Sequence, residues 1–104
     1  MKLIAFRSRL RDDAGPGYPE KADEMFAAAR AMPGFVDFRA YEAADGERLA
    51  LVWWEDEQSL RAWRDDPAHL EAQRLGRELW YASYALDVAS IERSSRFPAP
   101  DSES

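Results

Sequence analysis

One side chain that titrates near neutral pH lies among the aromatic rings of this chain. The segment from Trp53 to Tyr81 holds the only histidine, His69, and all four tryptophans. An imidazole titrates near neutral pH, so it can take a proton from a bound molecule. Large flat rings around it can line a pocket for a flat aromatic ligand. Core packing is the alternative use of each tryptophan taken singly, and a hydrogen-bonded structural role is the alternative for the histidine.

The stretch after Pro67 places His69 in line with other pocket candidates. His69, Gln73, Gly76 and Trp80 recur at steps of four, three and four residues, which puts them on one face of a helix. Glycine inside a helix costs roughly 1 kcal/mol relative to alanine, so Gly76 indicates close packing of a backbone or a ligand. This face suits a pocket that holds a flat molecule and offers it one proton acceptor.

Two groups of candidate site residues follow from this segment. Arg74 and Arg77 can bind an anionic substrate or stabilise an oxyanion, although solvated helix arginines are commoner. Trp53 and Trp54 point to opposite faces of a strand, one toward the helices and the other away from them. The candidate catalytic residues are His69, Trp54 and Arg74, and the candidate substrate-binding residues are Trp63, Gln73, Arg77, Trp80 and Tyr84.

The amino-acid composition argues against several classes of function. The 104 residues fit one domain, and the net charge of −6 disfavours binding to nucleic acid, which needs a basic face. The absence of cysteine excludes disulfides and thiolate chemistry, and a single histidine leaves little for a transition-metal site. No apolar run approaches the roughly 20 residues of a membrane span, and the charged N-terminus does not read as a signal peptide. We therefore expect a soluble cytoplasmic protein with no metal and no membrane partner.

Hydrophobic periodicity predicts six main elements. Strands are expected at residues 2–10, 35–43, 47–54 and 81–93, and helices at 20–32 and 67–80, with a short helix after Asp56. Asp45-Gly46 indicates a hairpin turn, while Asp56 and Asp66 are candidate N-caps. Pro67 would then be the first residue of its helix.

The order strand, helix, strand, strand, helix, strand is the ferredoxin-like βαββαβ arrangement of an α+β fold. It predicts a four-stranded antiparallel sheet with the helices on one face, formed by residues 1–94, followed by a flexible polar tail at 95–104. The run 49–54, LALVWW, is apolar on both strand faces, so the open sheet face needs a cover. A second copy of the chain is the economical cover, and we expect a homodimer with two sheets face to face.

The string from Met32 to Arg93 resembles the antibiotic biosynthesis monooxygenase domains, which are dimeric α/β-barrel proteins. The matching features are Pro33-Gly34-Phe35, Trp54 at the end of a strand, and Trp63 before a His-x-x-Ala-Gln-x-x-Gly-Arg run that starts at His69. The family includes cofactor-independent enzymes that oxidise polycyclic phenols to quinones with O2. It also includes haem-degrading enzymes and members without known activity.

The resemblance implies different site residues for the two activities. In the quinone-forming type, Trp54 matches a site tryptophan and Arg74 a site arginine, while Ala50 stands where that type has asparagine. In the haem-degrading type, Trp63 matches a helix tryptophan. The strand asparagine of that type is replaced by Arg7 or Ser8, and its histidine ligand falls near Gln73, one turn after His69.

Three functions are consistent with these observations. The first is a monooxygenase without a cofactor that oxidises a phenolic or polycyclic aromatic molecule, with His69 as the base or as the hydrogen-bond donor that orients the substrate. The second is a haem-binding and haem-degrading protein, with His69 as the axial ligand. The third is a non-enzymatic dimeric module for ligand binding or regulation, in which the indoles form the core.

Overall fold

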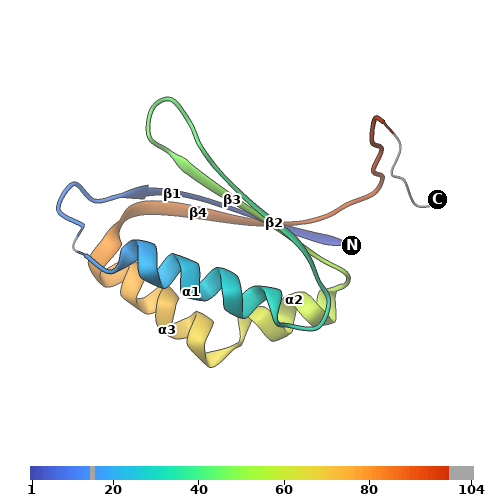
Figure 1. Ribbon diagram of the computed structural model, residues 1–104, viewed down its shortest axis with the longest axis horizontal. Coiled ribbons are helices and arrows are strands. Elements are labelled where there is room, and N and C mark those ends of the chain that lie inside the picture. Colours follow the sequence, from blue (N-terminus) through green and yellow to red (C-terminus); the bar gives the residue numbers. More distant parts are fainter. Residues whose placement is uncertain (15, 99–104) are drawn as a thin grey trace.

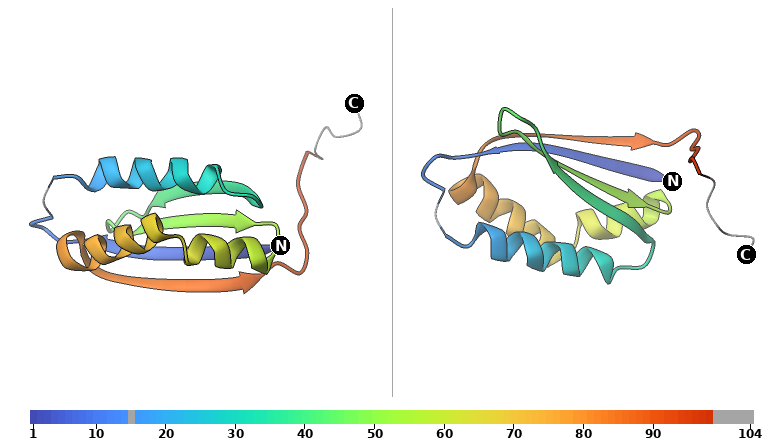
Figure 2. Two further views of the ribbon diagram at one scale, coloured as in Figure 1. Left: turned by 90° about the horizontal axis from the view of Figure 1, so that it is seen from below. Right: turned by 45° about the horizontal axis from the view of Figure 1, so that its top comes forward.

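A computed structural model describes residues 1–14 and 16–98 of the chain. Its four strands and three α-helices follow the predicted ferredoxin-like order, so the predicted fold class is confirmed. All three helices cover one face of the sheet and leave the other face open (Figures 1 and 2). The elements are β1 (Lys2–Leu10), α1 (Tyr18–Arg30), β2 (Phe35–Glu42), β3 (Arg48–Trp54), α2 (Glu57–Arg64), α3 (Pro67–Leu75), the helical turn η1 (Gly76–Trp80) and β4 (Tyr81–Ser90).

The sheet is antiparallel in the order β2-β3-β1-β4. Because paired residues of neighbouring strands point to the same face, the register arranges side chains in rows across the sheet. Three rows that face the helices, each written from β2 to β4, are Phe38-Val52-Ile4-Val88, Ala40-Ala50-Phe6-Leu86 and Glu42-Arg48-Ser8-Tyr84. The first row is apolar, the second has two small residues on β2 and β3, and the third is mostly polar.

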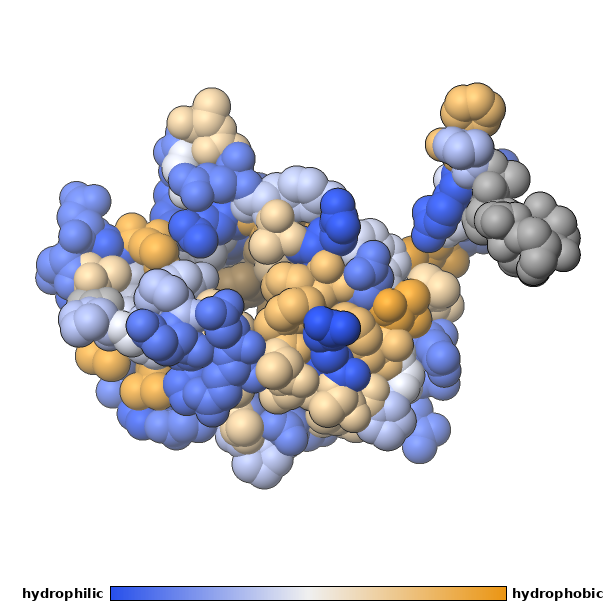
Figure 3. All heavy atoms as spheres, viewed as in Figure 1, coloured by the Kyte–Doolittle hydropathy of each residue, from blue (hydrophilic) through white to orange (hydrophobic). Residues whose placement is uncertain are grey.

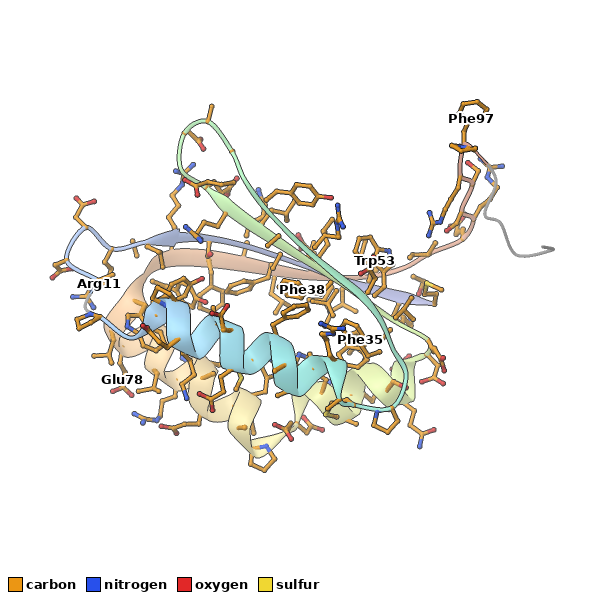
Figure 4. The ribbon with its side chains drawn as sticks, viewed as in Figure 1. Arg11, Phe35, Phe38, Trp53, Glu78 and Phe97 are labelled. Carbon is orange, nitrogen blue, oxygen red and sulfur yellow. The ribbon has the colours of Figure 1, made fainter. Side chains whose placement is uncertain are left out.

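The core lies between the first row and the helices. Trp54 is fully buried, and Leu60 and Trp63 of α2 pack with it and with Val52. Figure 4 shows Phe35 and Phe38 on the helix side of the sheet, and both pack against this core. Side chains therefore fill the end of the domain where β3 and β4 have their C-termini, and open space remains toward the β2–β3 hairpin.

The predicted turn and caps are found. The Asp56 carboxylate accepts the Ser59 amide hydrogen bond at 2.8 Å, and the Asp66 carboxylate accepts that of His69 at 3.1 Å. Pro67 is the first residue of α3, where its missing N–H costs nothing. Gly46 closes the β2–β3 hairpin with φ of 93°.

The helix predicted at 67–80 is not continuous. The α-helix ends at Leu75, and the last turn, η1, is a π-helix. Its end is fixed from outside the helix, because the Arg11 N–H donates to the Trp80 carbonyl at 2.8 Å and the Arg11 side chain donates to the Glu78 carbonyl at 3.0 Å (Figure 4). The wider turn sets the direction of the Trp80 and Tyr81 side chains. The 3.6-residue pattern gave no sign of it.

The open face of the sheet is partly apolar. Leu3 and Ala5 of β1 lie beside Trp53 and Leu51 of β3 there, and all four side chains are half-buried. Figure 4 shows Trp53 on the side of the sheet away from the helices. None of the elements in the described part of the chain covers this face.

The chain leaves the sheet after its last strand. Strand β4 ends at Ser90, and Phe97 is almost fully exposed beyond it (Figures 1 and 4). The predicted flexible tail, 95–104, lies mostly outside the described residues, which end at 98. No helix in the described part of the chain is long and apolar enough to cross a membrane.

Candidate functional site

A cavity of about 610 Å³ lies between the sheet and the helices α1 and α3. Small side chains leave this space: Ala40 and Ala50 on the sheet face Ala22 of α1 and Ala72 of α3. Figure 3 shows the surface hollowed between α1 and the sheet, beside apolar atoms of the same face. A volume of this size suits a small organic molecule, and mostly apolar walls suit an aromatic one.

His69 reaches the cavity from the first turn of α3. The Asp66 cap holds its backbone N–H, as described above, and its ring stacks on Trp63 with centroids 4.2 Å apart and planes 19° apart. Trp63 in turn stacks on the buried Trp54, at 6.1 Å between centroids. The imidazole is therefore held at the end of a stack of three rings that begins in the core.

A hydrogen bond determines which nitrogen of His69 carries the proton. Its Nδ1 lies 3.0 Å from the Trp63 carbonyl oxygen. A carbonyl can only accept, so Nδ1 carries the hydrogen and Nε2 keeps a free lone pair in the neutral ring. Burial lowers the pKa of His69 below its ordinary value of 6.5, and this outweighs the raising effect of the carbonyls of Trp63 and Arg64 and of the Asp66 charge. The ring is neutral at pH 7, and Nε2 can act as a base.

The structure brings together five of the eight residues predicted for the site. His69, Trp63, Gln73, Trp80 and Tyr84 all line the cavity. Gln73 lies one helical turn after His69, so its amide is on the same face of the helix.

The other three predicted residues do not line the cavity. Trp54 lies in the core behind Trp63. Arg74 lies on the exposed side of α3, where it is paired with Glu71 and, at 2.6 Å, with Glu78. These two carboxylates raise the pKa of the Arg74 guanidinium. Arg77 is also exposed. A helix has one face toward the cavity, and Arg74 and Arg77 fall outside the arc that Gln73 and Trp80 occupy.

Sequence reasoning missed several residues at the other end of the cavity. Tyr18, Arg48 and Tyr81 line it there, with Ser8 of the polar row. The Arg48 guanidinium lies over the Tyr18 ring, 5.7 Å from its centroid. The alternation Arg48, Ala50, Val52, Trp54 is a usable signal, because it assigns Arg48 to the helix-covered face of β3.

Comparison with known proteins identifies relatives of this architecture. A model of the antibiotic biosynthesis monooxygenase family matches residues 1–75. The uncharacterized protein YqjZ of Bacillus subtilis strain 168 is 32% identical over 90 residues, which cover 86% of this chain and 79% of YqjZ. The jasmonate monooxygenase ABM of Pyricularia oryzae is 29% identical over 98 residues; they cover 92% of this chain and 46% of that protein, which is about twice as long.

A solved structure extends the likeness to the fold. SnoaB, a cofactor-independent oxygenase from Streptomyces nogalater, superposes with a TM-score of 0.63 at 18% identity, over 89% of this chain and 94% of SnoaB. At this identity the likeness concerns the fold alone.

Proposed function

Because this chain belongs to the antibiotic biosynthesis monooxygenase family, we propose that it is a cofactor-independent monooxygenase that oxidises a phenolic or polycyclic aromatic substrate with O2. The observation that carries the proposal is the neutral His69 ring in the cavity wall, with Nδ1 bonded to the Trp63 carbonyl and Nε2 free. A base with a fixed tautomer beside an apolar cavity is what deprotonation of a bound phenol requires.

The chemistry begins with transfer of the phenol proton to His69 Nε2. The phenolate is electron-rich and reacts with O2, and a ring C–H carbon ortho or para to the oxygen forms the new C–O bond. His69 returns its proton to the peroxide. Loss of water from the resulting hydroperoxide leaves a quinone, so one oxygen atom of O2 enters the product and the other leaves as water. The four electrons that reduce O2 come from the substrate, and no external reductant is needed.

The cavity walls support two further parts of this reaction. Gln73, one turn from His69, would donate its amide N–H to the substrate oxygen as negative charge develops there. Trp63, Trp80 and Tyr84 would lie against the aromatic rings and exclude water. Trp54 acts as a positioning residue, since it supports Trp63. Arg74 and Arg77 have no role in this proposal, because neither lines the cavity.

The test is O2 uptake and quinone absorbance with naphthols and anthrols as substrates. His69→Ala should lower turnover by about 10²–10⁴-fold, the usual contribution of a positioned general base. Leu70→Ala is the matched control, because Leu70 is exposed on the same helix and does not line the cavity. Unchanged turnover in folded His69→Ala would remove His69 from the mechanism. Binding of the phenols with no O2 uptake would favour the non-enzymatic ligand-binding module.

We also propose that two copies of the chain pair through the open sheet face. The half-buried side chains of Leu3, Leu51 and Trp53 on that face support this, because an apolar sheet face is normally covered. Light scattering after gel filtration should give twice the 11.9 kDa chain mass. Trp53→Glu should halve it, whereas Leu79→Glu, on an exposed helical position, should not. A monomeric parent protein would refute the pairing.

Haem is the alternative ligand, and one observation favours it. With Nδ1 bonded to a carbonyl, the free Nε2 of His69 is the atom that would ligate iron. Bound haem would supply the redox chemistry, while the protein would supply the ligand and the apolar walls. Titration with haemin tests this: a shifted Soret band that is lost in His69→Ala supports haem binding, and an unshifted spectrum excludes it.

A further inference from the structure

The end of the cavity away from His69 is polar. The row Glu42-Arg48-Ser8-Tyr84 crosses all four strands there and follows directly on the row that contains Ala40 and Ala50. All four residues of the polar row line the cavity. An apolar floor that ends in a polar row matches a ligand with an apolar body and a polar head.

Aromatic residues beside the polar row lie at the same end of the cavity. Trp80 and Tyr18 lie edge to face with centroids 5.6 Å apart, and Tyr81 lies 6.0 Å from Tyr18. The Trp80 Nε1 is buried and has no hydrogen-bond partner among the described residues. Burial raises the pKa of the Tyr81 phenol, so this hydroxyl keeps its proton. The Trp80 nitrogen, like the Trp54 Nε1, is too deeply buried to be reached from the cavity, so the further donors at this end are the Tyr18 and Tyr81 hydroxyls.

Arg48 provides positive charge at this end. Its only ion-pair partner among the described residues is Glu42, with 3.5 Å between Nη1 and Oε1, and both side chains are about half exposed. A long pair in contact with solvent is weak, so the guanidinium remains free to bind a second anion. Ser8, which is paired with Arg48 in the register, is only 4% exposed and adds a hydroxyl directed to the cavity face.

We propose that the ligand of this cavity is an amphipathic organic acid, whose carboxylate lies at Arg48 and Ser8 and whose aromatic body lies on Ala40 and Ala50. The Arg48 guanidinium and the Ser8 hydroxyl are hydrogen-bond donors, and a carboxylate accepts hydrogen bonds from several donors at once. This inference rests on the proposed function, because it explains how the substrate is oriented. A carboxylate bound at one end of the cavity places the phenol at the other end, beside His69. His69 and Trp80 are eleven residues apart on α3 and η1, which is about 15 Å along the helix axis. Side chains reach in from both ends, so two or three fused rings fit between them.

Two fluorescent naphthols test the inference. They differ only in the carboxylate: 6-hydroxy-2-naphthoate carries its acid at the opposite end of the ring system from its hydroxyl, and 2-naphthol has none. Titration of the full chain should show about tenfold tighter binding of the acid, as one charge-assisted hydrogen-bonded pair gives. Arg48→Gln should remove that preference and leave the affinity for 2-naphthol unchanged. Arg61→Gln, which alters an arginine on the surface of α2 outside the cavity, should change neither affinity.

The outcomes separate this inference from the function on which it rests. Equal affinity for the two naphthols in the parent protein, or a preference that survives Arg48→Gln, overturns the acid-binding end alone. Failure of both naphthols to bind overturns it together with the proposed aromatic site. Oxidation of 2-naphthol with no advantage for the acid leaves the monooxygenase proposal standing and refutes the carboxylate head group.

Discussion

Substitution of Gly76 by alanine should destabilise this protein, although alanine is the better helix former. Gly76 has ordinary helical dihedrals, φ −59° and ψ −46°, so its backbone does not require glycine. Helix propensity alone predicts a gain of about 1 kcal/mol. However, a Cβ at this position would lie 2.4 Å from Tyr81 Cε2 and 2.7 Å from Cδ2. The ring or the turn must move.

The cost of that movement decides whether Gly76→Ala raises or lowers the free energy of unfolding. The Tyr81 ring is packed against Phe6, Tyr18 and Tyr84, with centroids 5.5, 6.0 and 5.8 Å away, so it has little room to shift. Overpacking of such a site costs about 1–3 kcal/mol, which outweighs the propensity gain. We expect Gly76→Ala to lower the free energy of unfolding by up to about 2 kcal/mol.

A double-mutant cycle isolates the contact between Gly76 and Tyr81. In a Tyr81→Val background the obstructing ring atoms are absent, so Gly76→Ala should become stabilising by about 1 kcal/mol. Urea denaturation of the four proteins measures this, provided that the m-value stays constant. The same effect of Gly76→Ala in both backgrounds would refute the idea that the Tyr81 ring keeps this position as glycine.

Three further predictions concern the cavity and the histidine beside it. Ala50→Leu should fill the space between sheet and helices and abolish binding of 2-naphthol in a fluorescence titration, with stability unchanged or raised by up to about 1 kcal/mol; undiminished binding would show that the ligand lies elsewhere. Asp66→Ala removes the acceptor of the His69 N–H and should cost about 1 kcal/mol in urea denaturation, whereas Asp12→Ala, in the exposed turn after β1, should cost little. Because burial lowers the pKa of His69, the native state binds fewer protons than the unfolded chain just below pH 6.5. The contribution of His69 to the free energy of unfolding is therefore complete above about pH 6.5 and is lost as the pH falls below it. The free energy of unfolding of His69→Gln, measured between about pH 5 and pH 7.5, should depend less on pH than that of the parent protein. Identical pH profiles for the two proteins would contradict the burial of His69.

Much of the fold follows from local sequence signals. Alternation in β3 and helical spacing in α1 are local patterns, and the carboxylates of Asp56 and Asp66 cap helices three residues before the amides that they accept from. Such signals act within a few residues of the chain, so they can be predicted from the sequence without the tertiary structure. The set of His69, Gln73 and Trp80 also came from one helical face, and all three line the cavity.

The arrangement of the site depended on contacts between distant segments. The polar row joins Ser8, Arg48 and Tyr84 only through strand register, which no local pattern specifies. The π-turn η1 accepts two hydrogen bonds, at the Glu78 and Trp80 carbonyls, from Arg11, which is far from it in the sequence.

The strands, the α-helices, their order and the helical face that carries the histidine could be predicted, because they depend on periodicity and on capping within a few residues. Which charged side chains line the cavity could not be predicted in this way. Arg74 and Arg48 are both arginines near aromatic residues, but Arg74 pairs with Glu71 and Glu78 on an exposed surface, whereas Arg48 lies on the covered face of the sheet beside Tyr18. The physical reason is that a side chain's surroundings are set by the elements packed against it, and packing joins residues that are far apart in the sequence.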